Sequence, residues 1–202
     1  MIRRCLTPLL VALLGAAAVA GNDPPKPAPI VLDEANLAKL REVAFEAARE
    51  GDVKALSAYF EIGQPVDVAN KRGDTLLILA AYHGHEDAVR VILARPKVPV
   101  DARNKMGFTA TTGAAYKGYV GIVKMLAEKG ADLNAANDRG QTPLMFAALF
   151  GRVEVVRFLV KSKVDLGKRD ERGRTALSLA RDQGKRNAAV IALLEEAEKA
   201  RP

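Results

Sequence analysis

Tryptophan is absent from this chain of 202 residues, and aromatic residues make up only 5% of it. This is not the composition of a carbohydrate-binding groove, which is usually lined by Tyr and Trp rings. The single cysteine, Cys5, excludes a disulfide scaffold and a cysteine-based zinc site. The two histidines, His83 and His85, leave little material for a metal centre built from imidazoles.

Hydrophobic residues, by contrast, form 49% of the chain and charged residues 27%, a balance that excludes disorder throughout. The length fits one domain of ordinary size. The formal net charge of +7 is only moderately basic, and no recognisable element for reading nucleic acid accompanies it. We therefore expect one folded domain that does not bind nucleic acid.

Residues 1–20 have the build of a cleaved secretory signal peptide. Arg3 and Arg4 precede an apolar run over 9–20, which ends in the cleavage pattern Ala-Val-Ala before Gly21. A membrane anchor is the alternative, but the run is shorter than the roughly 20 apolar residues that span a bilayer. Lipid attachment is not expected either, because Cys5 precedes the apolar run.

Cleavage after Ala20 would leave a chain without cysteine, which suits an oxidising compartment. It would also lower the net charge from +7 to +5. We expect a periplasmic protein with no stable membrane anchor, and full secretion is the alternative. Residues 21–32 are rich in proline and predict a stiff linker, with a docking motif for a proline reader as the other interpretation.

Two series of glycines recur every 33 or 34 residues in the remaining chain. The first series opens a Gly-x-Thr motif at Gly73, Gly107, Gly140 and Gly173. The second series comprises Gly51, Gly84, Gly118, Gly151 and Gly184. Pairs of alanines precede the second series, and apolar residues follow it at helical spacing. Each repeat thus predicts a short helix, a glycine turn, a second helix and a loop.

The segments Gly140–Gly151 (GQTPLMFAALFG) and Glu128–Asn134 (EKGADLN) resemble ankyrin repeats, as does the period of 33 residues. The Thr-Pro-Leu-His core of that family is kept only in part, with proline only at Pro143. An inserted residue near 96–99 predicts a bulged loop. The resemblance implies an all-α solenoid of about five helix-turn-helix repeats with short hairpin-like loops.

The predicted repeat domain covers 33–200, with repeats at about 37–69, 70–103, 104–136, 137–169 and 170–200. A longer opening helix is expected over 33–49, with Asp33 as its N-cap. The closing segment 188–200 ends in charged residues that suit a solvent-facing end of a solenoid.

The resemblance implies protein binding through the hairpin tips and the first helices, on the concave side of the stack. Six apolar or aromatic residues fall where solvent is expected: Tyr82, Met106, Phe108, Tyr116, Leu149 and Phe150. Basic residues are expected to edge this patch: Lys71, Arg72, Lys105, Lys117, Arg139, Arg172 and Arg174. Together they predict a protein partner with an acidic surface. The alternative is that some rings pack on neighbouring repeats and that the charges are simply solvated.

No catalytic residue, metal ligand or cofactor is predicted. His83-Gly-His85 has no third ligand in sight, and His85 holds the ankyrin Gly-His position, where histidine commonly caps structure. The recurring Asp101, Asp132 and Asp165 are interpreted as turn formers rather than as an acid/base pair.

The sequence therefore favours a monomeric, non-catalytic protein-binding module, an adaptor or accessory factor for a periplasmic protein. A link with oxidative stress rests on analogy with similar small exported proteins. The main alternative is an immunity protein that neutralises a delivered toxin. An enzyme and a host-directed effector are weaker alternatives.

Overall fold

The computed structural model describes residues 33–200, and the predicted signal peptide and linker lie outside this range. The described chain is helical throughout its regular elements, with one isolated bridge between Ala69 and Thr75. The helices are α2 (Glu34–Glu50), α3 (Val53–Glu61), α4 (Leu76–His83), α5 (Glu86–Leu93), α6 (Ala110–Lys117), α7 (Val120–Glu128), α8 (Pro143–Leu149), α9 (Val153–Lys161), α10 (Ala176–Asp182), the short 3-10 helix η1 (Gly184–Asn187) and α11 (Ala188–Lys199).

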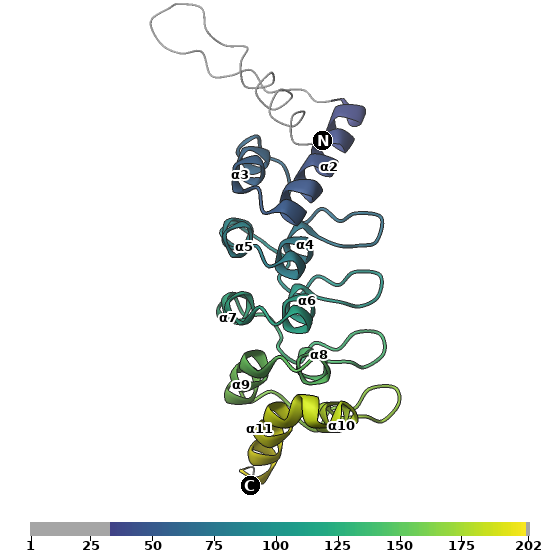
Figure 1. The fold of residues 1–202 in the computed structure, drawn as a ribbon. Coiled ribbons are helices and arrows are strands. Elements are labelled where there is room, and N and C mark those ends of the chain that lie inside the picture. Colours follow the sequence, from purple (N-terminus) through teal and green to yellow (C-terminus); the bar gives the residue numbers. More distant parts are fainter. Residues whose placement is uncertain (1–32, 201–202) are drawn as a thin grey trace, which may run out of the picture.

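The helices form two stacked layers (Figure 1). The first helices of the pairs, α2, α4, α6, α8 and α10, pack in sequence order, and the second helices α3, α5, α7, α9 and α11 pack beside them. Long loops project from the side of the first-helix layer (Figure 1). The predicted all-α repeat solenoid is therefore confirmed.

Local sequence sets the helix ends. The first helices α4, α6, α8 and α10 begin after a threonine whose hydroxyl accepts a backbone N–H from three residues further on, and these threonines are Thr75, Thr109, Thr142 and Thr175. Asp33 caps α2 in the same way, as predicted, with its carboxylate 2.7 Å from Asn36 N. Gly84 and Gly118 end α4 and α6 with positive φ, which glycine adopts without strain.

The core runs between the two layers as one continuous cluster. The paired alanines of the first helices are fully buried, so the backbones of successive helices approach closely. The second helices contribute branched apolar side chains with no exposed surface, such as Ile92, Leu126 and Leu159. No helix within 33–200 is both long and apolar enough to cross a membrane.

At three junctions between repeats, a side chain donates a hydrogen bond to the end of the preceding first helix. The ring of His85 donates through Nε2 to the carbonyl oxygen of Arg49 at 2.7 Å, because a carbonyl can only accept. Arg152 Nε donates to Tyr116 O at 2.9 Å, and Asn187 Nδ2 donates to Ala148 O at 2.7 Å. These side chains donate to carbonyls in the last turns of first helices, where intrahelical donors run out.

The loops end in four hairpin tips, which we define as residues 70–74, 104–108, 137–141 and 170–174. Each tip begins with a residue whose side-chain oxygen accepts the backbone N–H groups two and four positions later, and these residues are Asn70, Asn104, Asn137 and Asp170. Adjacent tips are also joined, for example by Asn104 Nδ2 to Asp74 Oδ1 at 2.8 Å and by Lys105 N to Arg72 O at 3.0 Å. The tips therefore form an ordered row.

The loop at the predicted insertion contains Lys97, which has a φ of 59°. This left-handed backbone conformation is uncommon for a residue with a side chain. The equivalent loop positions of the other repeats, Gly63, Gly130 and Lys163, also have positive φ, so this turn is a regular feature of the repeat. The stacking of α5 on α7 is retained across the insertion.

Candidate functional site

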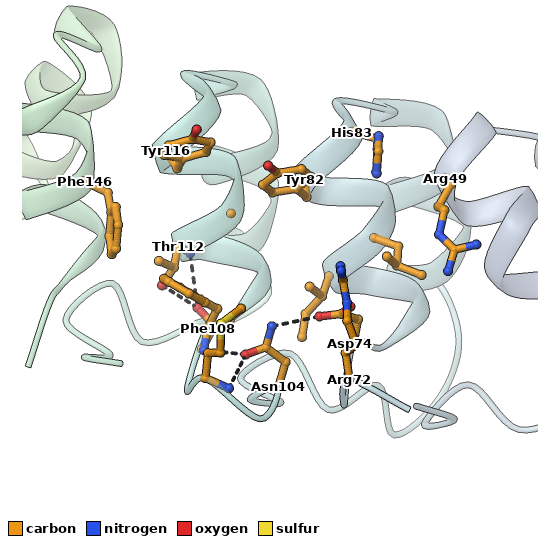
Figure 2. Close-up of a pocket in the computed structure, with 15 residues that line it drawn as sticks. Arg49, Arg72, Asp74, Tyr82, His83, Asn104, Phe108, Thr112, Tyr116 and Phe146 are labelled. Carbon is orange, nitrogen blue, oxygen red and sulfur yellow. Dashed lines mark hydrogen bonds and ion pairs between the residues drawn. The ribbon is translucent and has the colours of Figure 1, made fainter. Parts of the chain in front are cut away.

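A pocket of about 320 Å³ opens between the first helices and the hairpin tips, on the surface that we call the concave face (Figure 2). Its walls come from α4, α6 and the tips before them, with Phe146 of α8 on one side and Arg49 of α2 on the other (Figure 2). We call it the α4–α6 pocket. It lies where sequence register predicted the binding surface.

Gly113 leaves this pocket open. The same register position holds Leu79 in α4, Phe146 in α8 and Leu179 in α10. Gly113 lies inside α6 with ordinary helical backbone, and a Cβ atom built on it would lie 3.5 Å from Tyr82 Cβ, an ordinary contact. Neither backbone conformation nor crowding therefore requires glycine, although glycine costs a helix about 0.5–1 kcal/mol relative to alanine.

Five rings around the pocket form what we call the aromatic cluster: Tyr82, Phe108, Tyr116, Phe146 and Phe150. Tyr82 and Tyr116 stack with centroids 6.0 Å apart and planes within 6° of parallel. Tyr116 also meets Phe150 edge-on at 4.6 Å, and Phe108 meets Phe146 at 5.4 Å. These separations are those of favourable ring pairs, so the cluster is preorganised.

The six predicted apolar residues divide into two groups by exposure. Tyr82, Met106 and Phe150 are exposed, with 38%, 58% and 42% of their surface accessible. Phe108, Tyr116 and Leu149 are half-buried. Leu149 packs against the core and does not line the pocket, so its place in the binding patch stays a prediction.

The predicted basic residues also divide. Lys71, Arg72, Lys105, Arg139 and Arg172 are exposed on the tips. Lys117 is half-buried, and its Nζ lies 4.8 Å from the Tyr82 ring centroid, a cation–π contact at the pocket edge.

Arg174, predicted as a basic residue at the edge of the patch, forms an ion pair within its own tip. It is half-buried, and its guanidinium donates to the buried carboxylate of Asp170 at 2.7 and 2.9 Å. The last tip, which also carries Arg172, does not line the α4–α6 pocket. Two basic residues line the pocket, Arg49 and Arg72, and Lys117 lies beside it against the Tyr82 ring.

Two side chains in the pocket wall, Asp74 and His83, have shifted pKa values. Burial alone would raise the pKa of the Asp74 carboxyl, but hydrogen bonds from Asn104, Arg72 and Asn70 outweigh it and hold the pKa below its usual value. Burial lowers the pKa of His83, and the nearby charges of His85, Lys117 and Arg49 lower it further. At pH 7 the wall therefore carries an ionised Asp74 and a neutral His83.

Sequence reasoning missed several lining residues. Phe146 shares a register position with the buried Leu79 and was not among the predicted residues, but its half-buried ring lines one side of the pocket. Arg49 was missed because it ends α2, one repeat earlier, and reaches across the junction (Figure 2). The signal for the pocket was the glycine at position 113, where neighbouring repeats have a bulky side chain.

The residues considered for a metal site or an acid/base pair make structural contacts instead. Among residues 33–200, no three His, Cys, Asp or Glu side chains are grouped to hold a metal ion, and the His85 ring caps a carbonyl. The carboxylate of Asp101 accepts the backbone N–H of Asp132, while those of Asp132 and Asp165 accept N–H groups two residues further on. Asp132 and Asp165 therefore form turns, as predicted, whereas Asp101 links its loop to that of the next repeat.

Comparison with known proteins finds two family models of ankyrin repeats. One, for three copies, matches residues 44–137, and the other, for many copies, matches residues 126–180. A curated ankyrin repeat protein of Pseudomonas aeruginosa is 45% identical over 47 residues. The match covers 23% of this chain and spans 28% of the length of that relative.

Proposed function

The chain belongs to the ankyrin-repeat family, and we propose that it is a non-catalytic binding module that engages a protein partner through its concave face. Ankyrin repeats imply protein binding, and the family is generally a scaffold without chemistry of its own. The face proposed for binding comprises the hairpin tips and the exposed side of α4, α6 and α8.

The aromatic cluster is the main support for this proposal. A chain with few aromatics has gathered five rings on one face, and Tyr82 and Phe150 remain exposed there. Exposed aromatic residues are typical hot spots, whose truncation costs about 2 kcal/mol or more of binding free energy. Because the rings already contact one another, little side-chain freedom is lost when a partner binds.

The partner that we propose has an acidic surface. Arg72 and Lys117 lie at the pocket edge, and Lys71, Lys105 and Arg139 extend the basic row along the tips. The positive charges along this row would attract an acidic surface and speed its association with the concave face. We further propose that the protein acts as a monomer in the periplasm, as an adaptor or accessory factor, after cleavage at Ala20.

A pull-down from periplasmic extract tests this function. The full chain carries a C-terminal affinity tag, so that its own host processes the leader, and intact mass reports whether cleavage falls after Ala20. The test variant changes Tyr82, Met106 and Phe150 to Ala, and the control changes the exposed Lys54 and Lys124 of the second helices to Ala. Circular dichroism checks that both variants fold.

We expect a protein that is retained by the wild type and the control and lost with the test variant. Equal retention by all three would refute the concave face as the binding surface. Retention of nothing from the extract would count against an adaptor and favour the alternative proposal, an immunity protein whose toxin arrives from outside.

A further inference from the structure

We propose that the α4–α6 pocket is an anchor site for one bulky apolar side chain of the partner, presented by a segment with acidic residues beside that anchor. This inference rests on the proposed function and specifies the chemistry of the partner. The observation that supports it is the space that Gly113 leaves between its neighbours in the stack.

The size of the pocket favours a single side chain. Its volume is about 320 Å³, at the lower end of the roughly 300–1,000 Å³ that small-molecule sites enclose. A helix or a strand would need a longer groove, whereas one aromatic or leucine-like side chain fits within a space of this size. In the other repeats Leu79, Phe146 or Leu179 fills the corresponding position from within the chain.

The walls favour an apolar occupant. Ile78 and Leu79 line one side, and the rings of Phe108 and Phe146 line the other. The stacked rings of Tyr82 and Tyr116 lie above the opening (Figure 2). An inserted side chain would therefore meet carbon on most sides, and its transfer from water would supply the binding free energy.

The polar edge favours carboxylates next to the anchor. Arg49 and Arg72 line the pocket, and Lys117 lies next to it over the Tyr82 ring. Arg49 pairs with Glu46 at 2.7 Å and Arg72 with Asp74 at 3.1 Å. Asp74 is the only acidic residue among the described residues that line the pocket. Asp74 is buried and already accepts hydrogen bonds from Asn104, Arg72 and Asn70, so it offers little negative charge to a partner. A segment with Asp or Glu flanking its apolar residue would complement this edge.

Substitution of Gly113 tests the anchor site directly. Gly113→Leu restores the residue found at the same position in α4 and fills the pocket from within. The helical backbone at 113 accepts a Cβ without a clash, so the variant is expected to fold at least as well as the wild type. Lys124→Leu adds the same side chain at an exposed position of α7 and serves as the matched control.

The experiment selects peptides from a displayed random library on the immobilised full chain. We expect enrichment of peptides that carry Phe, Tyr, Trp, Leu or Met with Asp or Glu nearby. Fluorescence polarisation with an enriched peptide should show affinity at least about tenfold weaker for Gly113→Leu, and for a peptide with its anchor changed to Ala, with no change for Lys124→Leu.

Enriched peptides without an apolar residue, equal binding to Gly113→Leu, or no enrichment at all would overturn the anchor site. The pull-down separates this failure from failure of the proposed function. If Gly113→Leu retains a partner that the Tyr82, Met106 and Phe150 variant loses, the concave face binds but the pocket takes no anchor. If both variants retain it, both proposals fail.

Discussion

Asp170 holds a position that asparagine occupies in the other three hairpin tips. Its Oδ1 accepts the same two backbone N–H groups, but its Oδ2 also binds the guanidinium of Arg174. Burial raises the pKa of this carboxyl, but hydrogen bonds from Arg174 and Arg172 outweigh it and hold the pKa below its usual value. The ionised form therefore stabilises the fold.

Asp170→Asn should keep the turn and lose the ion pair. We expect a decrease of about 1 kcal/mol in the free energy of unfolding near neutral pH, since Arg174 is partly solvated. Because the folded pKa lies below the unfolded one, this stabilisation exists above the unfolded pKa and is lost as pH falls through the folded pKa. Urea denaturation of both proteins between about pH 7 and pH 3 should show the difference shrinking. A difference that stays constant with pH would contradict this assignment.

Thr111 is a buried polar residue at a position that holds leucine in the other repeats, namely Leu77, Leu144 and Leu177. Its hydroxyl has no hydrogen-bond partner among the described residues. Thr111→Val removes the hydroxyl at nearly constant shape, so we expect about 1 kcal/mol of added stability. Thermal or urea denaturation measures it, and an unchanged or lower stability would imply a partner for the hydroxyl. Peptide binding should be unchanged, because Thr111 does not line the pocket.

At the scale of the element, α6 differs from the other first helices. Its sequence, ATTGAAYK, places threonine and glycine where α4 has leucine and isoleucine. Both changes weaken helix or core, since Thr111 lacks a hydrogen bond and Gly113 lacks a side chain. Loss of helix stability next to an open pocket is the pattern expected where a binding site is built at the expense of packing.

Gly113→Ala separates helix stability from pocket volume. We expect the free energy of unfolding to rise by about 0.5–1 kcal/mol, because alanine restricts the unfolded chain and favours helix. A single Cβ in ordinary contact with Tyr82 occupies little of the pocket, so binding should fall far less than in Gly113→Leu. Parallel urea denaturation and peptide titration test this. A stability loss would show that the site requires glycine.

The helices could be predicted from sequence because their signals are local and repeated. Threonine caps, glycine ends and apolar spacing recur in each unit, so register alone placed α4 to α10. The pocket depends instead on the missing side chain at Gly113 and on residues from four repeats. Register located Tyr82 and Tyr116 but gave no means to see that Phe146 closes a wall or that Arg174 is bound by Asp170.

At the scale of the whole molecule, stability follows from stacking. The main contacts join each helix to its hairpin partner and to the equivalent helix of the next repeat. Such a stack approximates a row of units coupled to their neighbours, whose end units have only one neighbour. The α4–α6 pocket lies inside the row, where both adjacent repeats hold its walls in place.

Two leucine truncations of equal chemistry test this coupling. Leu126 of α7 and Leu194 of α11 are both buried, with exposures of 0% and 1%. Leu194→Ala should loosen α10 and α11 while α4–α7 keep their protection, because the end repeat can unfold alone. Leu126→Ala should accelerate amide exchange on both sides of α7, since each neighbour loses a stacking face, at a cost of about 2–5 kcal/mol.

Native-state hydrogen exchange, resolved helix by helix, distinguishes the two responses. Uniform acceleration by Leu194→Ala would show that the stack unfolds as one unit. The stability of the binding site would then depend on the end repeat as much as on the repeats that form the site. With the expected local response, Leu194→Ala leaves the pocket intact, and its affinity for the peptide should equal that of the wild type. Leu126→Ala should lower the affinity only under conditions in which the repeats around α7 unfold.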